Sequence, residues 1–104
     1  MLNQNQIKLI QEITDKVPKE YAILKSLEEI SELGTAICQS YTKDKLSKAE
    51  HYGRVLDEVA DVTIQLETIK HLFTITPQMF ELTLQKKIEK MKSKFENHVY
   101  PSLA

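Results

Sequence analysis

The spacing of the apolar residues is the feature that most constrains this chain. Ile, Leu, Val and Phe recur at intervals of three and four residues rather than two, which is the periodicity of a helix with one apolar face. Only two glycines and three prolines interrupt the pattern. We therefore expect an all-α protein, built as a bundle of about four helices.

The expected helices follow from these apolar positions and from the prolines. The first runs from about Asn5 to Val17 and ends before Pro18. The second runs from about Glu20 to Tyr41 and the third from about Lys48 to Phe73, each with an apolar seam at alternating steps of four and three. These seams are Ile23, Leu27, Ile30, Gly34, Ile37 and Tyr41 in the second helix, and Val55, Val59, Val62, Leu66, Ile69 and Phe73 in the third.

Two helix starts have their own sequence signals. Ser47 with Glu50 three residues later indicates a capping box that begins the third helix. Thr76 followed by Pro77 is typical of an N-cap with proline at the first helical position, and predicts a fourth helix. We expect the fourth helix to bury one apolar row and residues 98–104 to form a tail. The row consists of Phe80, Leu84, Ile88, Met91 and Phe95.

Composition limits the assembly and the partners. A length of 104 residues suits one domain over residues 1–104, but an apolar fraction of 41% is lean for a monomer, so we expect a homodimer or homotetramer to complete the core. The net charge of -1 gives no reason to expect a nucleic acid or an anionic membrane as partner. With no signal segment or membrane-length apolar run, we expect a soluble, cytoplasmic protein. The single cysteine, Cys38, should be a small buried residue.

Two pairs of acidic residues carry the candidate chemistry. Glu29 and Glu32 are three residues apart, as are Glu58 and Asp61, so in a helix both carboxylates of a pair lie on one side. Two antiparallel helices with one pair each could offer four carboxylates to a hard divalent ion, which would be Mg2+, with Mn2+ as the alternative. No histidine lies three residues after a glutamate, which disfavours a di-iron carboxylate site.

Ordinary surface acids are the alternative to a metal site, and the third helix argues against them. At about 100° per residue, Glu58 projects inside the apolar arc of that helix, with Asp61 at its edge. A second apolar strip on another side predicts that the helix is buried on two sides, where unpaired acids would be costly. Glu29 and Glu32 project away from the main seam of their helix and are the weaker pair. The second strip consists of Leu56, Ala60 and Ile64.

A basic row lies in the fourth helix. Lys87, Lys90 and Lys94 share one face at i, i+3 and i+7. Such a row could hold the phosphates of a nucleotide and neutralise charge that develops during phosphoryl transfer. The alternative is a solvated face near a helix C-terminus, where lysines suit the helix dipole. The acidic pairs favour the first interpretation, although the chain has no glycine-rich phosphate loop.

The order of the acidic residues resembles that of a known enzyme family. The segment Glu28-Glu29-Ile30-Ser31-Glu32-Leu33, followed by Glu58-Val59-Ala60-Asp61-Val62, is similar to the hallmark of the MazG-like all-alpha nucleoside triphosphate pyrophosphohydrolases. Together with the lysine-rich segment near the C-terminus, the resemblance covers roughly residues 20 to 95.

The resemblance implies hydrolysis of canonical or damaged nucleoside triphosphates to a nucleoside monophosphate and pyrophosphate, within a homodimer or homotetramer. It also implies that Mg2+ binds to Glu29, Glu32, Glu58 and Asp61, and phosphate to Lys87, Lys90 and Lys94. This chain has only lysine where relatives often include arginine, so bidentate phosphate contacts are lost. Two alternatives stay open: a non-enzymatic helical oligomer that binds a protein partner or senses nucleotides, and a related hydrolase acting on a nucleoside diphosphate or phosphoribosyl-ATP.

Overall fold

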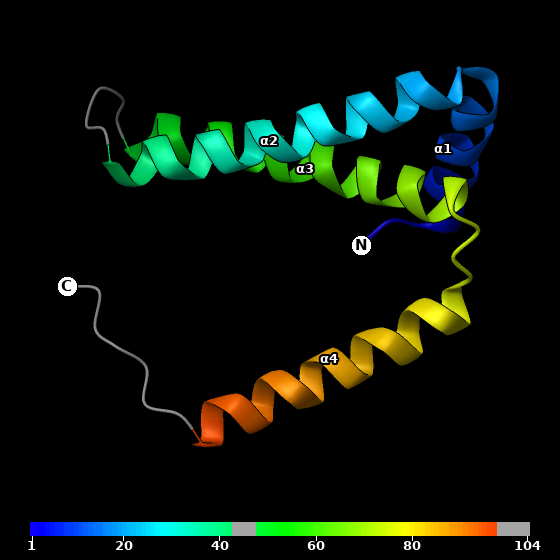
Figure 1. The fold of residues 1–104 in the computed structure, drawn as a ribbon. Coiled ribbons are helices and arrows are strands. Elements are labelled where there is room, and N and C mark those ends of the chain that lie inside the picture. Colours follow the sequence, from blue (N-terminus) through cyan, green and yellow to red (C-terminus); the bar gives the residue numbers. More distant parts are fainter. Residues whose placement is uncertain (43–47, 98–104) are drawn as a thin grey trace. The chain divides into compact units, whose positions relative to one another are not determined.

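The computed structural model describes residues 1–42 and 48–97, and over these residues it contains four α-helices and no strand (Figure 1). The helices are α1 (Gln4–Lys16), α2 (Lys19–Thr42), α3 (Lys48–Leu72) and α4 (Pro77–Asn97). The all-α prediction is confirmed, and the bounds expected for the first three helices differ from these by no more than one residue. The predicted cap at Ser47 and the predicted tail over residues 98–104 lie outside the described residues.

Side-chain caps explain where two of the helices begin. The side chain of Asn3 accepts a hydrogen bond from the backbone N–H of Gln6, whose side chain accepts one from the backbone N–H of Asn3, both at 2.9 Å. This capping box starts α1 one residue earlier than expected, because it satisfies N–H groups that a helix start leaves unpaired. At α4, Thr76 Oγ1 accepts a hydrogen bond from the Met79 N–H at 3.2 Å, which confirms the N-cap predicted there.

Residue contacts divide the chain into two compact units, Met1–Thr74 and Ile75–Ala104. The first unit contains α1, α2 and α3, and the second contains α4. Within its own unit α4 has no buried residue and, over the described residues, no second helix to pack against, so the expected burial of its apolar row stays a prediction. The single domain expected over residues 1–104 stays a prediction.

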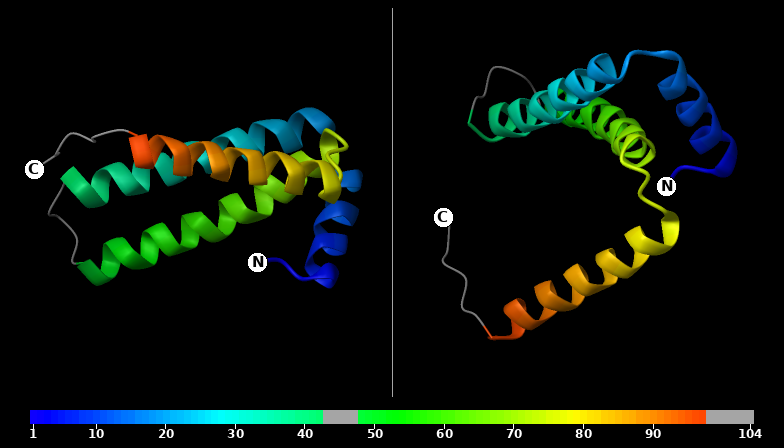
Figure 2. Two further views of the ribbon diagram at one scale, coloured as in Figure 1. Left: turned by 90° about the horizontal axis from the view of Figure 1, so that it is seen from below. Right: turned by 45° about the vertical axis from the view of Figure 1, so that its right-hand side comes forward.

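Within the first unit, α2 and α3 lie side by side and run in opposite directions, and α1 packs against α3 near one end of the pair (Figures 1 and 2). The side of α2 that is buried has small and polar side chains. We call this row the buried seam. It consists of Ala22, Ser26, Glu29 and Ala36, which are spaced by four, three and seven residues.

Of the large apolar residues expected in the core of α2, Ile23 is half-buried, and the others occupy a different row and are exposed. Leu27 follows the buried Ser26 and Ile30 follows the buried Glu29, so this second row lies about 100° around the helix. A matching exposed row on α3 includes Val59, directly after Glu58. We call the two rows together the apolar face; its members are Leu27, Ile30, Ile37, Tyr41, Tyr52, Leu56, Val59, Leu66 and Phe73. The heptad spacing was predicted correctly, but spacing does not say which of two neighbouring rows meets the other helix.

Two further expectations about burial are wrong for the single chain. Cys38 is exposed, because it lies two residues after Ala36 and so on the far side of α2 from the buried seam. The second strip of α3 is also exposed, at Leu56, Ala60 and Ile64. The chain alone therefore buries α3 mainly on the side that faces α2.

Polar contacts join the three helices of the first unit. Ser26 Oγ donates to Gln65 Oε1 at 3.0 Å and so links α2 to α3. His71 Nε2 lies 2.7 Å from Asp15 Oδ1 and links α3 to α1. Over residues 1–42 and 48–97, no helix combines the length and the apolar character that crossing a membrane requires.

Candidate metal centre

The acidic residues of α2 and α3 come together where the two helices face each other. One carboxylate oxygen from each of Glu29, Glu58 and Asp61 lies within 4.8 Å of the others, and the same holds for Glu28, Glu29 and Glu32. Glu29 belongs to both groups and therefore links the acids of α2 to those of α3. We call these five residues the acidic cluster. The structure thus places all four predicted metal ligands in one cluster and adds Glu28.

Burial differs sharply among these acids. Glu29 is only 6% exposed because it lies in the buried seam, and Glu58 is half-buried opposite it on α3. Glu32 and Asp61 are exposed, since each lies three residues further along its helix and therefore about 60° back around it. The sequence suggested that Glu29 is among the weaker candidates; the structure makes it the most buried acid of the cluster.

Two carboxylate oxygens in the cluster are buried without a hydrogen-bond partner, Oε2 of Glu29 and Oε2 of Glu58. A buried carboxylate oxygen that has lost water and gained no donor costs free energy. A divalent cation would remove that cost, and Mg2+ and Mn2+ prefer oxygen ligands of this kind. The donor set therefore fits the ion that the sequence predicts.

The crowding of negative charge also changes the pKa values of Glu32 and Asp61, which we call the rim acids. The negative charge of Glu29, followed by desolvation, raises the pKa of Glu32 above its ordinary value. Desolvation, followed by the charge of Glu29, raises the pKa of Asp61. Carboxyl groups whose pKa values are shifted by neighbouring charge and burial are typical of functional sites.

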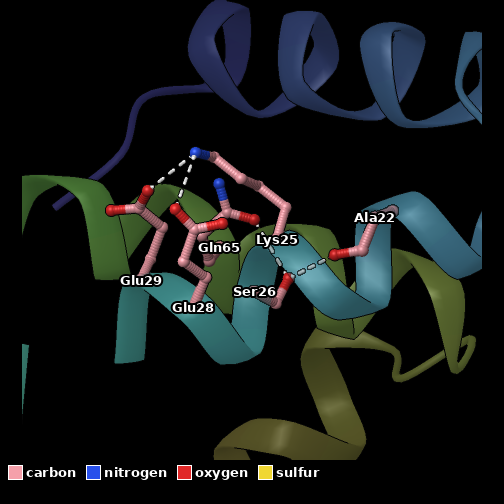
Figure 3. A network of polar contacts seen from close by, with 6 residues as sticks. All are labelled: Ala22, Lys25, Ser26, Glu28, Glu29 and Gln65. Atoms are coloured by element: carbon pink, nitrogen blue, oxygen red, sulfur yellow. Dashed lines mark hydrogen bonds and ion pairs between the residues drawn. The ribbon is translucent and has the colours of Figure 1, made fainter. Parts of the chain in front are cut away.

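Lys25 is a residue of this site that the sequence analysis missed. Its Nζ lies 3.0 Å from Glu29 Oε1 and 3.8 Å from Glu28 Oε1, so one ammonium group contacts two acids of the cluster (Figure 3). Lys25 precedes them by three and four residues, which places all three on one side of α2. That spacing was available in the sequence, although surface ion pairs with the same spacing are common.

A small pocket shares one residue, Lys25, with the contacts of the acidic cluster. Its volume is about 140 Å³, and α1, α2 and α3 all contribute to its mainly apolar walls, which include Ile10, Ile13, Val17, Tyr21 and Ile64. The side chain of Lys25 also lines this pocket, while its ammonium group contacts Glu29. A molecule with an apolar part and an anionic part could therefore use the pocket and the cluster together.

The three predicted phosphate-binding residues lie in the second unit. Lys87, Lys90 and Lys94 are on α4, where all three are exposed. Nearby on the same helix, Lys92 Nζ forms an ion pair with Glu96 Oε1 at 3.8 Å. The acidic cluster belongs to the first unit, so the phosphate-binding role of the row stays a prediction.

Comparisons with protein-family models, with curated proteins and with solved structures found no match for this chain. The resemblance to MazG-like enzymes therefore depends on the residues and spacings in the sequence, and it stays a hypothesis about family and function.

Proposed function

We propose that this protein is a divalent-metal-dependent hydrolase of nucleoside triphosphates, which releases a nucleoside monophosphate and pyrophosphate. One observation carries the proposal: Glu29 is a buried carboxylate with an unpartnered oxygen, and it is shared by acidic groups from two facing helices. An acid that serves only solubility would lie on an exposed side of α2, where it keeps its water.

Under this proposal Glu29, Glu32, Glu58 and Asp61 hold Mg2+, or Mn2+ in its place. The bound ion would polarise the phosphate oxygens and neutralise charge in the transition state. A water oxygen would form a bond to the α phosphorus, and the bond from that phosphorus to the bridging oxygen would break, so that pyrophosphate leaves. The exposed acids Glu32 and Asp61 would orient the attacking water, whose proton is lost more easily beside a bound divalent ion.

The pocket supports a nucleotide rather than an inorganic phosphoanhydride as substrate. Its walls are mainly apolar, and it shares Lys25 with the contacts of a cluster of acids. A nucleoside triphosphate has a matching division, with an aromatic base at one end and phosphates that bind a divalent ion at the other. Phosphate binding by Lys87, Lys90 and Lys94 is proposed from the family resemblance alone.

We further propose that a second copy of the chain covers the apolar face, giving a homodimer or a homotetramer. Both rows of the face lie one residue after the positions where α2 and α3 meet, and in an antiparallel pair this rotation leads to the same side. A continuous apolar surface of this kind is unusual on a monomer. An identical surface on a second copy would match it about a twofold axis, residue for residue.

The proposed activity is tested by measuring pyrophosphate release from a panel of ribo- and deoxynucleoside triphosphates with and without Mg2+. We expect release that requires the ion and falls at least about 100-fold in Glu58→Gln. In the same panel, orthophosphate release from a nucleoside diphosphate or pyrophosphate release from phosphoribosyl-ATP would identify a different phosphoanhydride substrate. Absence of release from every substrate, or full activity in Glu58→Gln, would refute the hydrolase.

The non-enzymatic alternative makes a different prediction about stability. A nucleotide bound with Mg2+ at about 100 times its Kd would stabilise the folded protein by about 2.7 kcal/mol through mass action. A thermal-shift screen with non-hydrolysable nucleotides therefore detects binding without turnover. Binding combined with no pyrophosphate release would favour a nucleotide sensor, and no shift with any nucleotide would favour a protein-binding oligomer.

A further inference from the structure

The ammonium group of Lys25 occupies the part of the acidic cluster where an ion would be expected to interact. It lies 3.0 Å from Glu29 Oε1, while Glu29 Oε2 is buried and has no hydrogen-bond partner. Exposed lysine–glutamate pairs one turn apart on a helix are ordinary and weak. This pair is different, because the Glu29 carboxylate is shielded from solvent on the side facing α3.

A divalent ion and the Lys25 ammonium group would compete for the same carboxylate. An ion held by Glu29, Glu58 and Asp61 would lie within a few ångströms of Lys25 Nζ, because that atom is already in contact with Glu29. Two positive charges at such a separation repel each other, most strongly where solvent is partly excluded. The long and flexible lysine side chain can respond by moving, whereas Glu29 and Glu58 are held between two packed helices.

The direction of that movement is set by the surroundings of Lys25. Its side chain lines the apolar pocket formed with α1, and Figure 3 shows it reaching from α2 toward the carboxylates of Glu28 and Glu29. If the base of a nucleotide entered the pocket, its phosphates would lie close to the ammonium group of Lys25. The ammonium group would then exchange a carboxylate partner for a phosphate partner.

We propose that Lys25 exchanges partners when the metal ion binds. Before binding it neutralises Glu28 and Glu29; after binding it leaves them and contacts the phosphates of the nucleotide. This inference rests on the proposed metal-dependent function. It predicts opposite signs for one substitution: loss of the ammonium group should strengthen binding of the ion alone and weaken binding of the nucleotide.

The test is calorimetric titration of the wild-type protein and of Lys25→Met, which keeps most of the apolar stem but not the charge. Titrations use Mn2+ alone, and then a non-hydrolysable nucleoside triphosphate at saturating Mn2+. For Mn2+ alone we expect Lys25→Met to bind about twofold to fivefold more tightly than the wild type, the range that ion pairs at partly exposed positions span. For the nucleotide we expect binding that is about tenfold weaker.

Two matched variants separate charge from structure. Lys19→Met removes an exposed lysine from the same helix and should change neither titration. Lys25→Arg keeps the positive charge and should bind Mn2+ alone as the wild type does. Thermal unfolding of each variant reports whether it folds, and Lys25→Gln replaces Lys25→Met if the latter does not.

The outcomes distinguish this inference from the proposed function. If the wild type binds Mn2+ and Lys25→Met binds it equally or less tightly, the exchange is refuted while the metal site stands. If Mn2+ binding tightens but nucleotide affinity is unchanged, the transfer of Lys25 to the phosphates is refuted. If the wild type does not bind Mn2+ at millimolar concentration, the exchange and the proposed metal-dependent function both fail.

Discussion

Two neighbouring rows on α2 are opposite in character. The buried seam has small or polar side chains and meets α3, with Glu29 near its middle. The α2 row of the apolar face has large side chains such as Leu27 and Ile37, and it is exposed. In a simple two-helix arrangement these assignments would be reversed, because burying large apolar groups contributes most to stability.

The difference shows that the contact between α2 and α3 contains acids of the cluster, while the largest apolar residues of α2 lie outside it. Small residues at Ala22, Ser26 and Ala36 let the helices approach each other, so that acids from both can meet. The apolar rows are left for another surface, which we propose is a second copy of the chain. The functional site and the assembly surface thus use different sides of one helix pair.

The largest effect is expected from neutralising the most buried acid. Glu29→Gln removes the carboxylate shared by both acidic groups, so we expect pyrophosphate release to fall at least about 100-fold. Glu12→Gln, an exposed acid on α1, is the control and should keep its activity. Wild-type activity in Glu29→Gln would mean that the buried seam has no catalytic role.

A smaller but clear effect is expected on the apolar face. Leu27→Glu would bury a charge in the proposed contact with a second copy, and should weaken self-association by about tenfold to 100-fold. Leu24→Glu is the matched control, because Leu24 is also exposed but lies on the outer side of α2. Mass by light scattering across a dilution series measures both. Equal masses for Leu27→Glu and the wild type at every concentration would remove this surface as the interface.

The pH dependence of ion binding separates the acidic cluster from ordinary surface acids. Raised pKa values at Glu32 and Asp61 mean that both carboxyls hold protons at pH values where ordinary acids are ionised. Without an ion, the stability that comes from protonating these two carboxyls in the folded protein is present at low pH. It is lost as the pH rises through the raised pKa values.

An ion needs the ionised carboxylates, so its affinity should fall as the pH is lowered, starting above the ordinary carboxyl values of 4.5 for Glu32 and 3.8 for Asp61. Titrations with Mn2+ over a series of pH values measure this. Glu32→Gln should move the midpoint to lower pH, because it removes one of the two carboxyls whose pKa is raised. A midpoint at the ordinary carboxyl pKa in the wild type would contradict the crowding of charge.

The smallest effect is expected on stability, when each of the two glycines, Gly34 and Gly53, is replaced by alanine. A Cβ atom added at Gly53 or at Gly34 meets nothing within 4 Å in the single chain. Alanine at either helical position should therefore stabilise a monomer by about 1 kcal/mol. Gly34 lies in line with the apolar face and Gly53 does not, so Gly34→Ala should gain less if a second copy packs there. Equal gains in urea-induced unfolding would indicate that the face stays open at Gly34.

The sequence predicted the helices well, because their signals are local. Apolar spacing and the Thr76-Pro77 cap predicted most bounds to within one residue. The one-residue difference at the start of α1 comes from a capping box between Asn3 and Gln6. The acidic residues could likewise be selected by spacing alone, and the structure brings them together.

What the sequence could not decide was the rotation of each helix about its axis. Glu29 and Ile30 are adjacent in the chain, and only the packing of α2 on α3 determines that the acid is buried and the isoleucine exposed. For the same reason the row of Phe80, Leu84 and Ile88 was expected to be buried, although no neighbouring helix covers it within its unit. Lys25 was missed because its role depends on the burial of Glu29.

The most direct test of the central claim is a crystal of the protein grown with MnCl2 and measured at a wavelength where manganese scatters anomalously. The proposal predicts an anomalous peak between α2 and α3, at about 2.1 Å from carboxylate oxygens that include Glu29 and Glu58. A well-ordered acidic cluster with no such peak, in crystals grown at millimolar Mn2+, would contradict the assignment of this cluster as a metal centre.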